Sequence, residues 1–240
     1  MYHELVYQLL TRNHICNEND LPVWVIGDVH GCGDAFKKLV ADIKKTSPNC
    51  IIFQLGDLID RGPDVLSVFN TVQEHDIKTC IGNHELNFIQ EWFGYKQCRS
   101  KARRETHDKI RSLPQHEQDI IIDGILKMQN YYTVEVSSAI WTLSHAPIRT
   151  EIDMFEDGGA GNTYCMSTTP YENNIINKDC VHGHMHWNYR DINQQIADKE
   201  QGWYNVDGGA CYGGELIALE LGSLQVIRKP GVAYATHSHY

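Results

Sequence analysis

A chain of 240 residues with 42% hydrophobic residues is long enough to form one large domain with a buried core. Its net charge of −10 argues against an extensive nucleic-acid surface, and no apolar run approaches the roughly 18 to 20 residues that span a bilayer. The first twenty residues mix apolar and charged side chains, unlike a secretory signal, so we expect a cytoplasmic protein without a membrane partner.

The first third of the chain alternates apolar runs with helical patterns. Residues 23–26, 51–55 and 77–81 are short apolar runs typical of buried strands. Between them, apolar side chains recur with helical spacing in two segments, and we expect Asp34 to cap the first helix and Pro63 and Asp64 to open the second. This alternation predicts an α/β unit with parallel strands.

The remaining two thirds of the chain predict further helices and a second group of strands. Residues 85–130 have a polar, helical pattern, and residues 131–144 form a hairpin around Ser137 and Ser138. Residues 150–175 predict a long loop or small cap at the mouth of a site. Four later runs have strand character: 179–182, 203–206, 216–221 and 224–228, the last two joined by a two-residue turn at Gly222 and Ser223. We therefore expect an α/β (α+β) fold in which two mixed sheets pack as a central sandwich flanked by helices, with residues 1–240 forming a single domain.

Three polar motifs stand directly behind the three early strands. Gly-Asp-Val-His-Gly occupies 27–31, Gly-Asp-Leu-Ile-Asp-Arg-Gly occupies 56–62, and Gly-Asn-His-Glu occupies 82–85. The carboxyl ends of neighbouring parallel strands meet at one edge of a sheet, so the motifs bring carboxylate, imidazole and amide groups together. Such groups hold divalent metals, and two adjacent metals promote attack on a phosphorus ester. The Asp and Asn residues also suit helix caps, but capping does not explain His30 and His84.

These motifs resemble those of the calcineurin-like metallophosphoesterases, in the forms found in the phosphoprotein-phosphatase branch and its bacterial and bacteriophage lambda-type serine/threonine protein phosphatases. Two later segments extend the likeness, Leu-Ser-His-Ala at 143–146 and Val-His-Gly-His at 181–184. The similarity covers roughly residues 22–226, whereas residues 95–130 and 147–178 match nothing in the family pattern.

The resemblance implies two divalent metal ions, with Mn²⁺ preferred over Fe, Zn or Co. Asp28 and His30 would bind the first ion and Asp57 would bridge both. The second ion would be completed by Asn83, His145 and His184.

The resemblance also implies catalytic roles. His84 would protonate the leaving group and Asp60 would orient it. Arg61 would hold the phosphate oxygens, with a contribution from Asn83. The expected function is a phosphomonoesterase, first of all a serine/threonine protein phosphatase, that works by direct attack of a metal-bridging hydroxide. The expected partner is therefore a phosphorylated protein or a small phosphate ester.

Two other classes of function remain open: other phosphate-ester hydrolases and non-catalytic binding modules. The same core serves a dinucleoside-polyphosphate hydrolase of the diadenosine-tetraphosphatase kind or a 2′,3′-cyclic phosphodiesterase. A non-catalytic binding module would keep the fold without the chemistry.

The roles of several residues also remain open. His182, His184 and His186 alternate, so on a strand they would share a face, and either His182 or His186 is an alternative or additional ligand. Arg149 is a candidate second phosphate ligand, and Tyr212 a candidate neighbour of the phosphate. The basic stretch from Lys96 to Arg111 is a solvated helix face or a rim that attracts a phosphorylated substrate. Eight cysteines without a CxxC pair indicate buried free thiols and argue against both a disulfide framework and a zinc–cysteine site.

Overall fold

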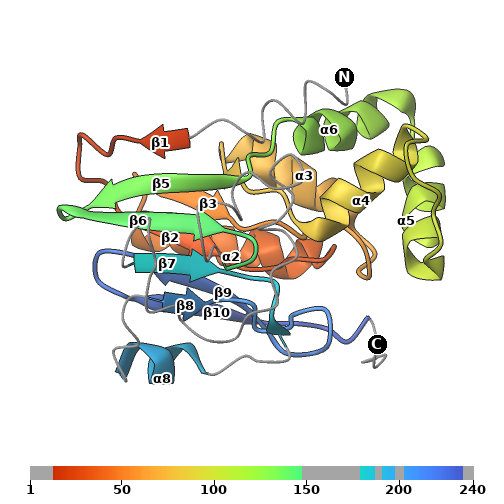
Figure 1. The fold of residues 1–240 in the computed structure, drawn as a ribbon. Coiled ribbons are helices and arrows are strands. Elements are labelled where there is room, and N and C mark those ends of the chain that lie inside the picture. The colour runs from red at the N-terminus through yellow and green to blue at the C-terminus, as the bar shows by residue number, and fades with distance from the viewer. Residues whose placement is uncertain (1–12, 148–178, 187–190, 198–202, 235–240) are drawn as a thin grey trace.

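The computed structural model describes residues 13–147, 179–186, 191–197 and 203–234. It contains two five-stranded sheets that lie face to face, with helices outside them (Figure 1). The α/β architecture with two mixed sheets is therefore the one that the sequence predicts. The prediction of a single domain over residues 1–240 stays a prediction.

The first sheet in the chain is built around the predicted parallel strands. Its order is β10-β9-β2-β3-β4, in which β2, β3 and β4 are parallel and β9 is antiparallel to β2 and β10. The helices α2 and α3 make the crossovers and pack on each other. The bounds of these elements are β2 (Val23–Ile26), α2 (Gly33–Thr46), β3 (Ile51–Gln54), α3 (Val65–Glu74), β4 (Lys78–Thr79), β9 (Glu215–Glu220) and β10 (Val226–Pro230).

The second sheet has the order β1-β5-β6-β7-β8. The predicted hairpin forms its centre, and positive φ angles of 50° and 67° at Ser137 and Ser138 give the turn the twist that a two-residue hairpin needs. Strand β1 and helix α8 have no counterpart in the sequence-based prediction. The bounds are β1 (Asn13–Ile15), β5 (Tyr131–Val136), β6 (Ala139–Ser144), β7 (Asp179–His182), α8 (Ile192–Ala197) and β8 (Trp203–Asn205).

Three helices connect β4 to β5 and confirm the helical prediction for residues 85–130. They are α4 (Asn83–Trp92), α5 (Lys101–Arg111) and α6 (Gln115–Leu126). Figure 1 shows α4, α5 and α6 together at one end of the sheets. Strands β6 and β7 run in parallel, and their arrowheads point towards this end of the molecule.

The strand β2 is buried on both faces. Trp24 and Ile26 belong to the apolar cluster that includes α2 and α3, whereas Val23 and Val25 belong to the cluster between the two sheets. Successive side chains of a strand point to opposite faces, so a strand between two layers needs an uninterrupted apolar sequence.

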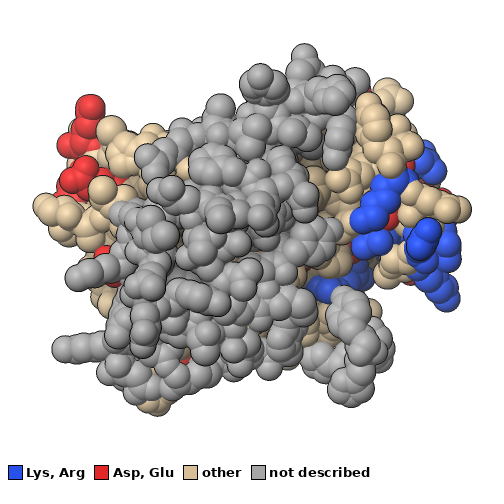
Figure 2. Space-filling view, in the orientation of Figure 1, with Lys and Arg blue, Asp and Glu red and all other residues tan. Residues whose placement is uncertain are grey.

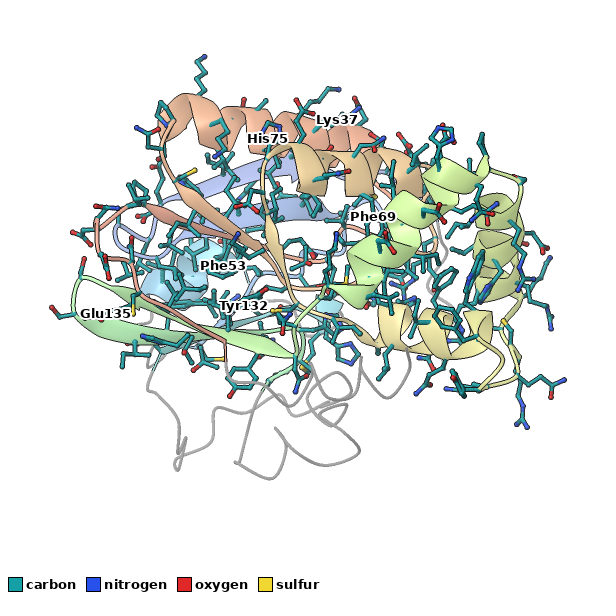
Figure 3. The ribbon with its side chains drawn as sticks, turned by 90° about the horizontal axis from the view of Figure 1, so that it is seen from above. Lys37, Phe53, Phe69, His75, Tyr132 and Glu135 are labelled. Atoms are coloured by element: carbon teal, nitrogen blue, oxygen red, sulfur yellow. The ribbon has the colours of Figure 1, made fainter. Side chains whose placement is uncertain are left out.

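The core between the sheets joins strands that are far apart in the sequence. Figure 3 labels Phe53 of β3 and Tyr132 of β5, whose rings meet edge to face with centroids 5.1 Å apart. Apolar side chains from both sheets surround this pair.

Three local predictions were wrong at their boundaries. Helix α2 begins at Gly33 behind Cys32, and Asp34 lies in the first turn instead of capping it. Strand β4 is only two residues long. The connection between β9 and β10 spans residues 221–225, because the Glu220 carboxylate accepts the backbone N–H groups of Gly222 and Ser223 and organises a wider turn than the predicted two residues.

Several expectations concern residues outside the described ranges, among them the loop over residues 150–175. The seven described cysteines are free thiols, as expected. Within the described ranges, no helix is both long and apolar enough to cross a bilayer.

Candidate active site

The three early motifs and the later histidines converge at one end of the two sheets. Asp28 and Asp57 follow β2 and β3, and His145 and His184 follow β6 and β7. The backbone N–H groups of Val29 and His30 donate to the Asp57 carbonyl, at 3.1 Å and 2.8 Å, and tie the first motif to the second. All nine residues in the predicted ligand and catalytic sets lie within the described ranges: Asp28, His30, Asp57, Asp60, Arg61, Asn83, His84, His145 and His184.

The buried carboxylate of Asp57 stands at the centre of the site. Its Oδ2 lies 3.4 Å from Nε2 of His30 and 3.7 Å from Nε2 of His84. Its Oδ1 lies 3.4 Å from Nε2 of His145. Asp57 thus belongs to two groups whose donor atoms lie within 4.8 Å of one another, one with His30 and His84 and one with His145 and His184. This is the geometry of a carboxylate shared between two cations.

The rings of His30 and His145 are oriented with Nε2 towards the Asp57 carboxylate. Nδ1 of His145 lies 2.8 Å from the Leu55 carbonyl, and Nδ1 of His30 lies 2.9 Å from the Ile59 carbonyl, so each ring donates its proton to the backbone. Burial lowers the pKa of both rings and keeps them neutral.

The ligands predicted for the second ion lie together. His145 Nε2 is 3.0 Å from the Asn83 side-chain oxygen and 3.1 Å from Nδ1 of His184. Burial also lowers the pKa of His184, to about 3, so this ring too is neutral near pH 7.

Two further buried carboxyl groups, those of Asp28 and Asp207, lie beside Asp57. Asp28 accepts the backbone N–H of His184 at 3.1 Å, and Asp207, which the sequence analysis did not select, interacts with Asp28. Burial, together with the charges of Asp207 and Asp57, raises the pKa of Asp28. Burial raises the pKa of Asp207 to about 6. Neutral imidazoles facing crowded carboxylates are the donor set that divalent cations satisfy, so the residues present fit two metal ions.

His84 and Asp60 form a pair beside this centre. Nδ1 of His84 lies 2.5 Å from Oδ2 of Asp60, and the ring meets that of His30 edge to face at 4.7 Å. Burial alone would lower the pKa of His84, but the charge of Asp57 and the hydrogen bond to Asp60 outweigh it and raise that pKa. The His84 ring therefore stands next to the Asp57 carboxylate, with its Nε2 3.7 Å from Oδ2 of Asp57.

The guanidinium of Arg61 lies at the same place. It contacts Nε2 of His30, lies 5.1 Å above the centre of the Tyr212 ring, and approaches Sγ of Cys211 at 3.9 Å. The Tyr212 ring also stacks on His186 at 4.3 Å, and Nδ1 of His186 is 3.9 Å from Oδ2 of Asp207. Tyr212 and His186 thus border the site, and ligation by His186 stays a prediction.

Glu85 holds the backbone of the second motif in place, a role that the sequence pattern did not predict. The fully buried carboxylate accepts four backbone N–H groups, from Asp57, Leu58, Ile59 and Gly82, at 2.7 to 3.1 Å. Burial and the charge of Asp57 raise its pKa to about 7. Glu85 thereby fixes the second motif to the start of α4.

Five of the predicted site residues have a left-handed backbone. Their φ angles lie between 45° and 68°, a region that costs energy for residues other than glycine: His30, Asp57, Asp60, Arg61 and His184. Such conformations aim the side chains out of the loops and towards one point.

The alternating histidines do not share a strand face, so this interpretation was wrong. Strand β7 ends at His182, and the left-handed conformation of His184 redirects the chain. His182 is buried, with Nδ1 2.9 Å from the Gly183 carbonyl. Gly183 itself passes so close to Asp28 that an added Cβ would lie 2.1 Å from Oδ1. Arg149 lies outside the described residues.

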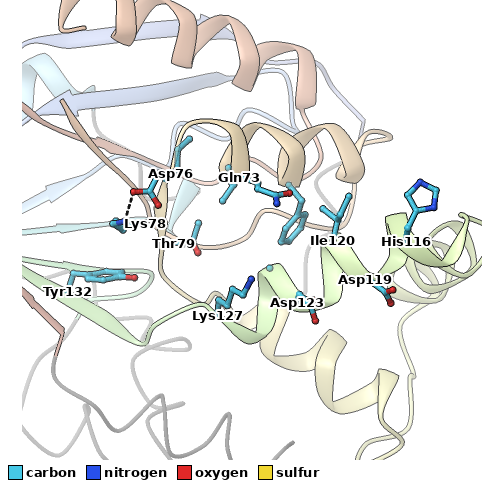
Figure 4. Close-up of a pocket in the computed structure, with 14 residues that line it drawn as sticks. Gln73, Asp76, Lys78, Thr79, His116, Asp119, Ile120, Asp123, Lys127 and Tyr132 are labelled. Carbon is cyan, nitrogen blue, oxygen red and sulfur yellow. Dashed lines mark hydrogen bonds and ion pairs between the residues drawn. The ribbon is translucent and has the colours of Figure 1, made fainter. Parts of the chain in front are cut away.

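A separate cavity of about 420 Å³ opens elsewhere, between α3 and α6 (Figure 4). Its wall includes an ion pair between Asp76 and Lys78 at 2.8 Å, together with Asp119, Asp123 and Lys127. None of the predicted site residues lines it.

The basic stretch forms helix α5, which packs on α4 beside the site. The helix carries five Lys and Arg side chains against two acidic ones. Lys and Arg gather at the right edge of the molecule in Figure 2, where Figure 1 places α5. The hydroxyl of Thr106 on this helix interacts with Asp60 and helps to lower the pKa of that carboxyl, against the raising effect of burial. A cationic helix thus adjoins the His84–Asp60 pair.

Comparisons of the sequence with known proteins agree on one family. The model of the family described as calcineurin-like phosphoesterase matches residues 21–240. A symmetrical bis(5′-nucleosyl)-tetraphosphatase of Acidovorax sp. (strain JS42) is 30% identical over 100 residues, which are 41% of this chain and 34% of that protein. Serine/threonine-protein phosphatase 1 of Salmonella typhimurium is 38% identical over 63 residues, 26% of this chain and 29% of that protein.

Solved structures agree on the fold. A structure described as a candidate diadenosine tetraphosphatase superposes with a TM-score of 0.67 at 17% identity, covering 93% of this chain and 100% of the other. The matches to the two curated relatives span only about a third of their lengths.

Proposed function

This chain belongs to the calcineurin-like phosphoesterase family, and we propose that it is a binuclear-metal phosphohydrolase whose substrate is a dinucleoside polyphosphate. The observation that carries the hydrolase is the position of Asp57 between two donor groups, with the His84–Asp60 pair alongside. Two bound divalent ions would supply Lewis-acid charge and acidify a water molecule.

The side chains of the site have separable tasks in this proposal. Asp28, His30, Asp57, Asn83, His145 and His184 hold the ions, with Mn²⁺ as the first metal to test. Arg61 binds the phosphate oxygens, assisted by Asn83. His84, held through Nδ1 by Asp60, gives its Nε2 proton to the leaving oxygen.

Two observations favour a polyphosphate substrate. Several of the relatives with significant similarity carry the name of a symmetrical bis(5′-nucleosyl)-tetraphosphatase. In addition, the cationic helix α5 adjoins the His84–Asp60 pair, and clustered positive charge attracts polyanions. A compact aryl phosphate gains less from such a helix than a chain of four phosphates.

The proposal is tested by comparing kcat/KM for diadenosine tetraphosphate, a phosphoserine peptide, p-nitrophenyl phosphate and its diester analogue, each with Mn²⁺. We expect diadenosine tetraphosphate to be preferred, and symmetrical hydrolysis to return two molecules of ADP. The double variant Lys101→Glu/Arg104→Glu on α5 should lower kcat/KM for the tetraphosphate and leave that for p-nitrophenyl phosphate unchanged. Lys37→Glu/Lys38→Glu on α2 is the matched control. Preference for the diester would support a phosphodiesterase instead.

The second candidate is a protein phosphatase, and the similarity to the Salmonella enzyme favours it. Its prediction is the opposite preference, for the phosphoserine peptide over the tetraphosphate, with no dependence on the two α5 cations. Failure to cleave any of the four substrates with metal bound would contradict both candidates.

A further inference from the structure

A third group of donor side chains lies outside the centre described above. Glu91 near the end of α4, Cys98 in the connection to α5, and His107 on α5 bring one donor atom each to within 4.8 Å of one another. In the described part of the chain, it is the one such group that does not contain Asp57. The side chains of Glu91 and His107 are almost completely buried, and Cys98 is half-buried at the solvent side.

Two of the three donors are held in place by their neighbours. The His107 ring stacks on Phe88 and on Trp92, with centroids 4.4 Å and 5.8 Å away. Oε1 of Glu91 accepts from Nε of Arg103 at 3.1 Å, which leaves Oε2 directed at His107. The nitrogen and oxygen donors are therefore fixed by packing and by an ion pair.

The separation of these donors suits one tetrahedral ion. Nε2 of His107 and Oε2 of Glu91 are 3.2 Å apart. Two donor atoms that each lie about 2.1 Å from a tetrahedral ion are about 3.4 Å apart. The sulfur of Cys98 needs to lie about 3.6 Å from the oxygen, which from a present separation of no more than 4.8 Å is a shift of about 1.2 Å at most.

The protonation states of His107 and Cys98 also bear on metal binding. Burial lowers the pKa of His107, so its ring is neutral. Nε2 faces the Glu91 carboxylate and donates its proton to it, so this nitrogen becomes available to an ion when the proton moves to Nδ1. Burial, and then the neighbouring Glu91 carboxylate, raise the pKa of the Cys98 thiol. A thiol beside a buried carboxylate gains from a divalent cation, which stabilises the thiolate and the carboxylate together.

We propose that Glu91, Cys98 and His107 bind a single zinc ion through Oε2, Sγ and Nε2. Thiolate and imidazole donors select zinc over magnesium, calcium or manganese, so this site would differ in preference from the centre at Asp57. On binding, the thiol releases its proton to solvent, and the His107 proton occupies Nδ1, an atom that is buried without a hydrogen-bond partner. A water molecule takes the fourth position on the half-buried side. The ion then fastens the segment between α4 and α5 to both helices.

The test uses cobalt as the probe, because a cobalt–thiolate bond has a charge-transfer absorption in the near ultraviolet. Metal-free protein comprising residues 1–240 is titrated with Co²⁺ and its spectrum recorded. As the cobalt sites fill, we expect the thiolate band to reach the intensity of one thiolate-bound Co²⁺ per chain, and Cys98→Ser and His107→Phe each to abolish it. His107→Phe keeps the aromatic stacking and removes only the nitrogen donors.

Three controls separate this site from other thiols and from the candidate active site. Cys50→Ser removes a thiol of similar exposure, and Cys211→Ser removes the one beside Arg61. Both variants should keep the band, as should Asp57→Asn. Zinc analysis after dialysis should find one equivalent in Asp57→Asn and none in Asp57→Asn/Cys98→Ser.

Absence of the band in wild type, or its loss in Cys50→Ser or Cys211→Ser but not in Cys98→Ser, would overturn the proposal. Circular dichroism verifies that the Cys98→Ser and His107→Phe variants are folded. The readouts do not involve phosphate hydrolysis, so the result is independent of the proposed function.

Discussion

Oε2 of Glu85 accepts the backbone N–H of Asp57 at 2.9 Å, so a buried carboxylate on α4 holds the residue that both groups of candidate metal donors share. The other oxygen, Oε1, accepts the N–H groups of Leu58 and Ile59 at 2.7 Å and 3.1 Å. The shape of the second motif therefore depends on a side chain from the third.

This relationship predicts the effect of Glu85→Gln. The amide presents an NH₂ group where Oε1 or Oε2 accepted backbone protons, so at least one buried N–H loses its partner. We expect the free energy of unfolding to fall by about 3 kcal/mol, and Mn²⁺ affinity to fall with it. Denaturant unfolding and metal titration measure the two effects. Glu74→Gln, at the exposed end of α3, is the matched control, and equal behaviour of both variants would refute the role of Glu85.

His84→Asn should affect the chemical step and not the metals. The amide N–H is too weak an acid to protonate a leaving oxygen, so we expect kcat to fall by roughly 10²- to 10⁴-fold for the phosphoserine peptide, whose alkoxide leaving group needs a proton. Metal content should stay at the wild-type value. The loss should be smaller for diadenosine tetraphosphate and p-nitrophenyl phosphate, whose leaving groups need little protonation. Asp60→Asn should show the same pattern more weakly, and a uniform loss for all substrates would argue against an acid role for His84.

Gly183→Ala should weaken metal binding through a steric effect. An added Cβ would lie 2.1 Å from Oδ1 of Asp28, so the carboxylate would have to move away from its position beside His184. We expect a loss in Mn²⁺ affinity of roughly tenfold to a hundredfold, measured by calorimetry. Gly222→Ala is the control, because the nearest atom to its added Cβ is the end of the Glu220 side chain at 3.3 Å. Unchanged affinity in Gly183→Ala would show that Asp28 does not ligate.

His182 should make the fold sensitive to acid. Burial lowers its pKa to about 4 in the folded protein, from 6.5 in the unfolded chain. The folded state therefore resists protonation, so the contribution of His182 to stability is complete above pH 6.5 and is lost as the pH falls towards 4. Between these pH values, the free energy of unfolding falls by about 3 kcal/mol because of His182.

The His182 prediction is measured by denaturant unfolding of metal-free protein between pH 7 and 4. His182→Asn keeps a donor for the Gly183 carbonyl but does not titrate, so its stability should fall less over this interval. Parallel curves for the variant and wild type would contradict the prediction. Because other buried imidazoles titrate in both proteins, only the difference between the two curves reports on His182.

The sequence predicted those parts of the fold that depend on local patterns. The strands β2 and β3 and the motifs behind them could be located because apolar runs and the polar residues that follow them are neighbours in the chain. Glu85 and Asp207 were missed for the opposite reason. Glu85 acts on backbone groups 26 to 28 residues away, and Asp207 reaches Asp28 only because the chain after β8 returns to β2.

The histidines after β7 show a second limit of sequence patterns. Alternation predicted one face for His182, His184 and His186, which assumes that the strand continues. The strand ends at His182 because the chain must pass Asp28 closely at Gly183. The spacing of the histidines in the sequence does not predict that Gly183 passes so close to Asp28.

The left-handed conformations at the site have a consequence for how the protein can lose its activity. Glycine adopts a φ angle of 53° or 68° without strain, whereas Asp57 and His184 each do so at a cost of about 1 kcal/mol or more. A mutation of either residue to glycine would remove a proposed metal ligand and at the same time relieve the local backbone. Selection for a stable fold alone would thus accept inactive sequences at these positions, and only selection for the reaction retains an aspartate and a histidine there.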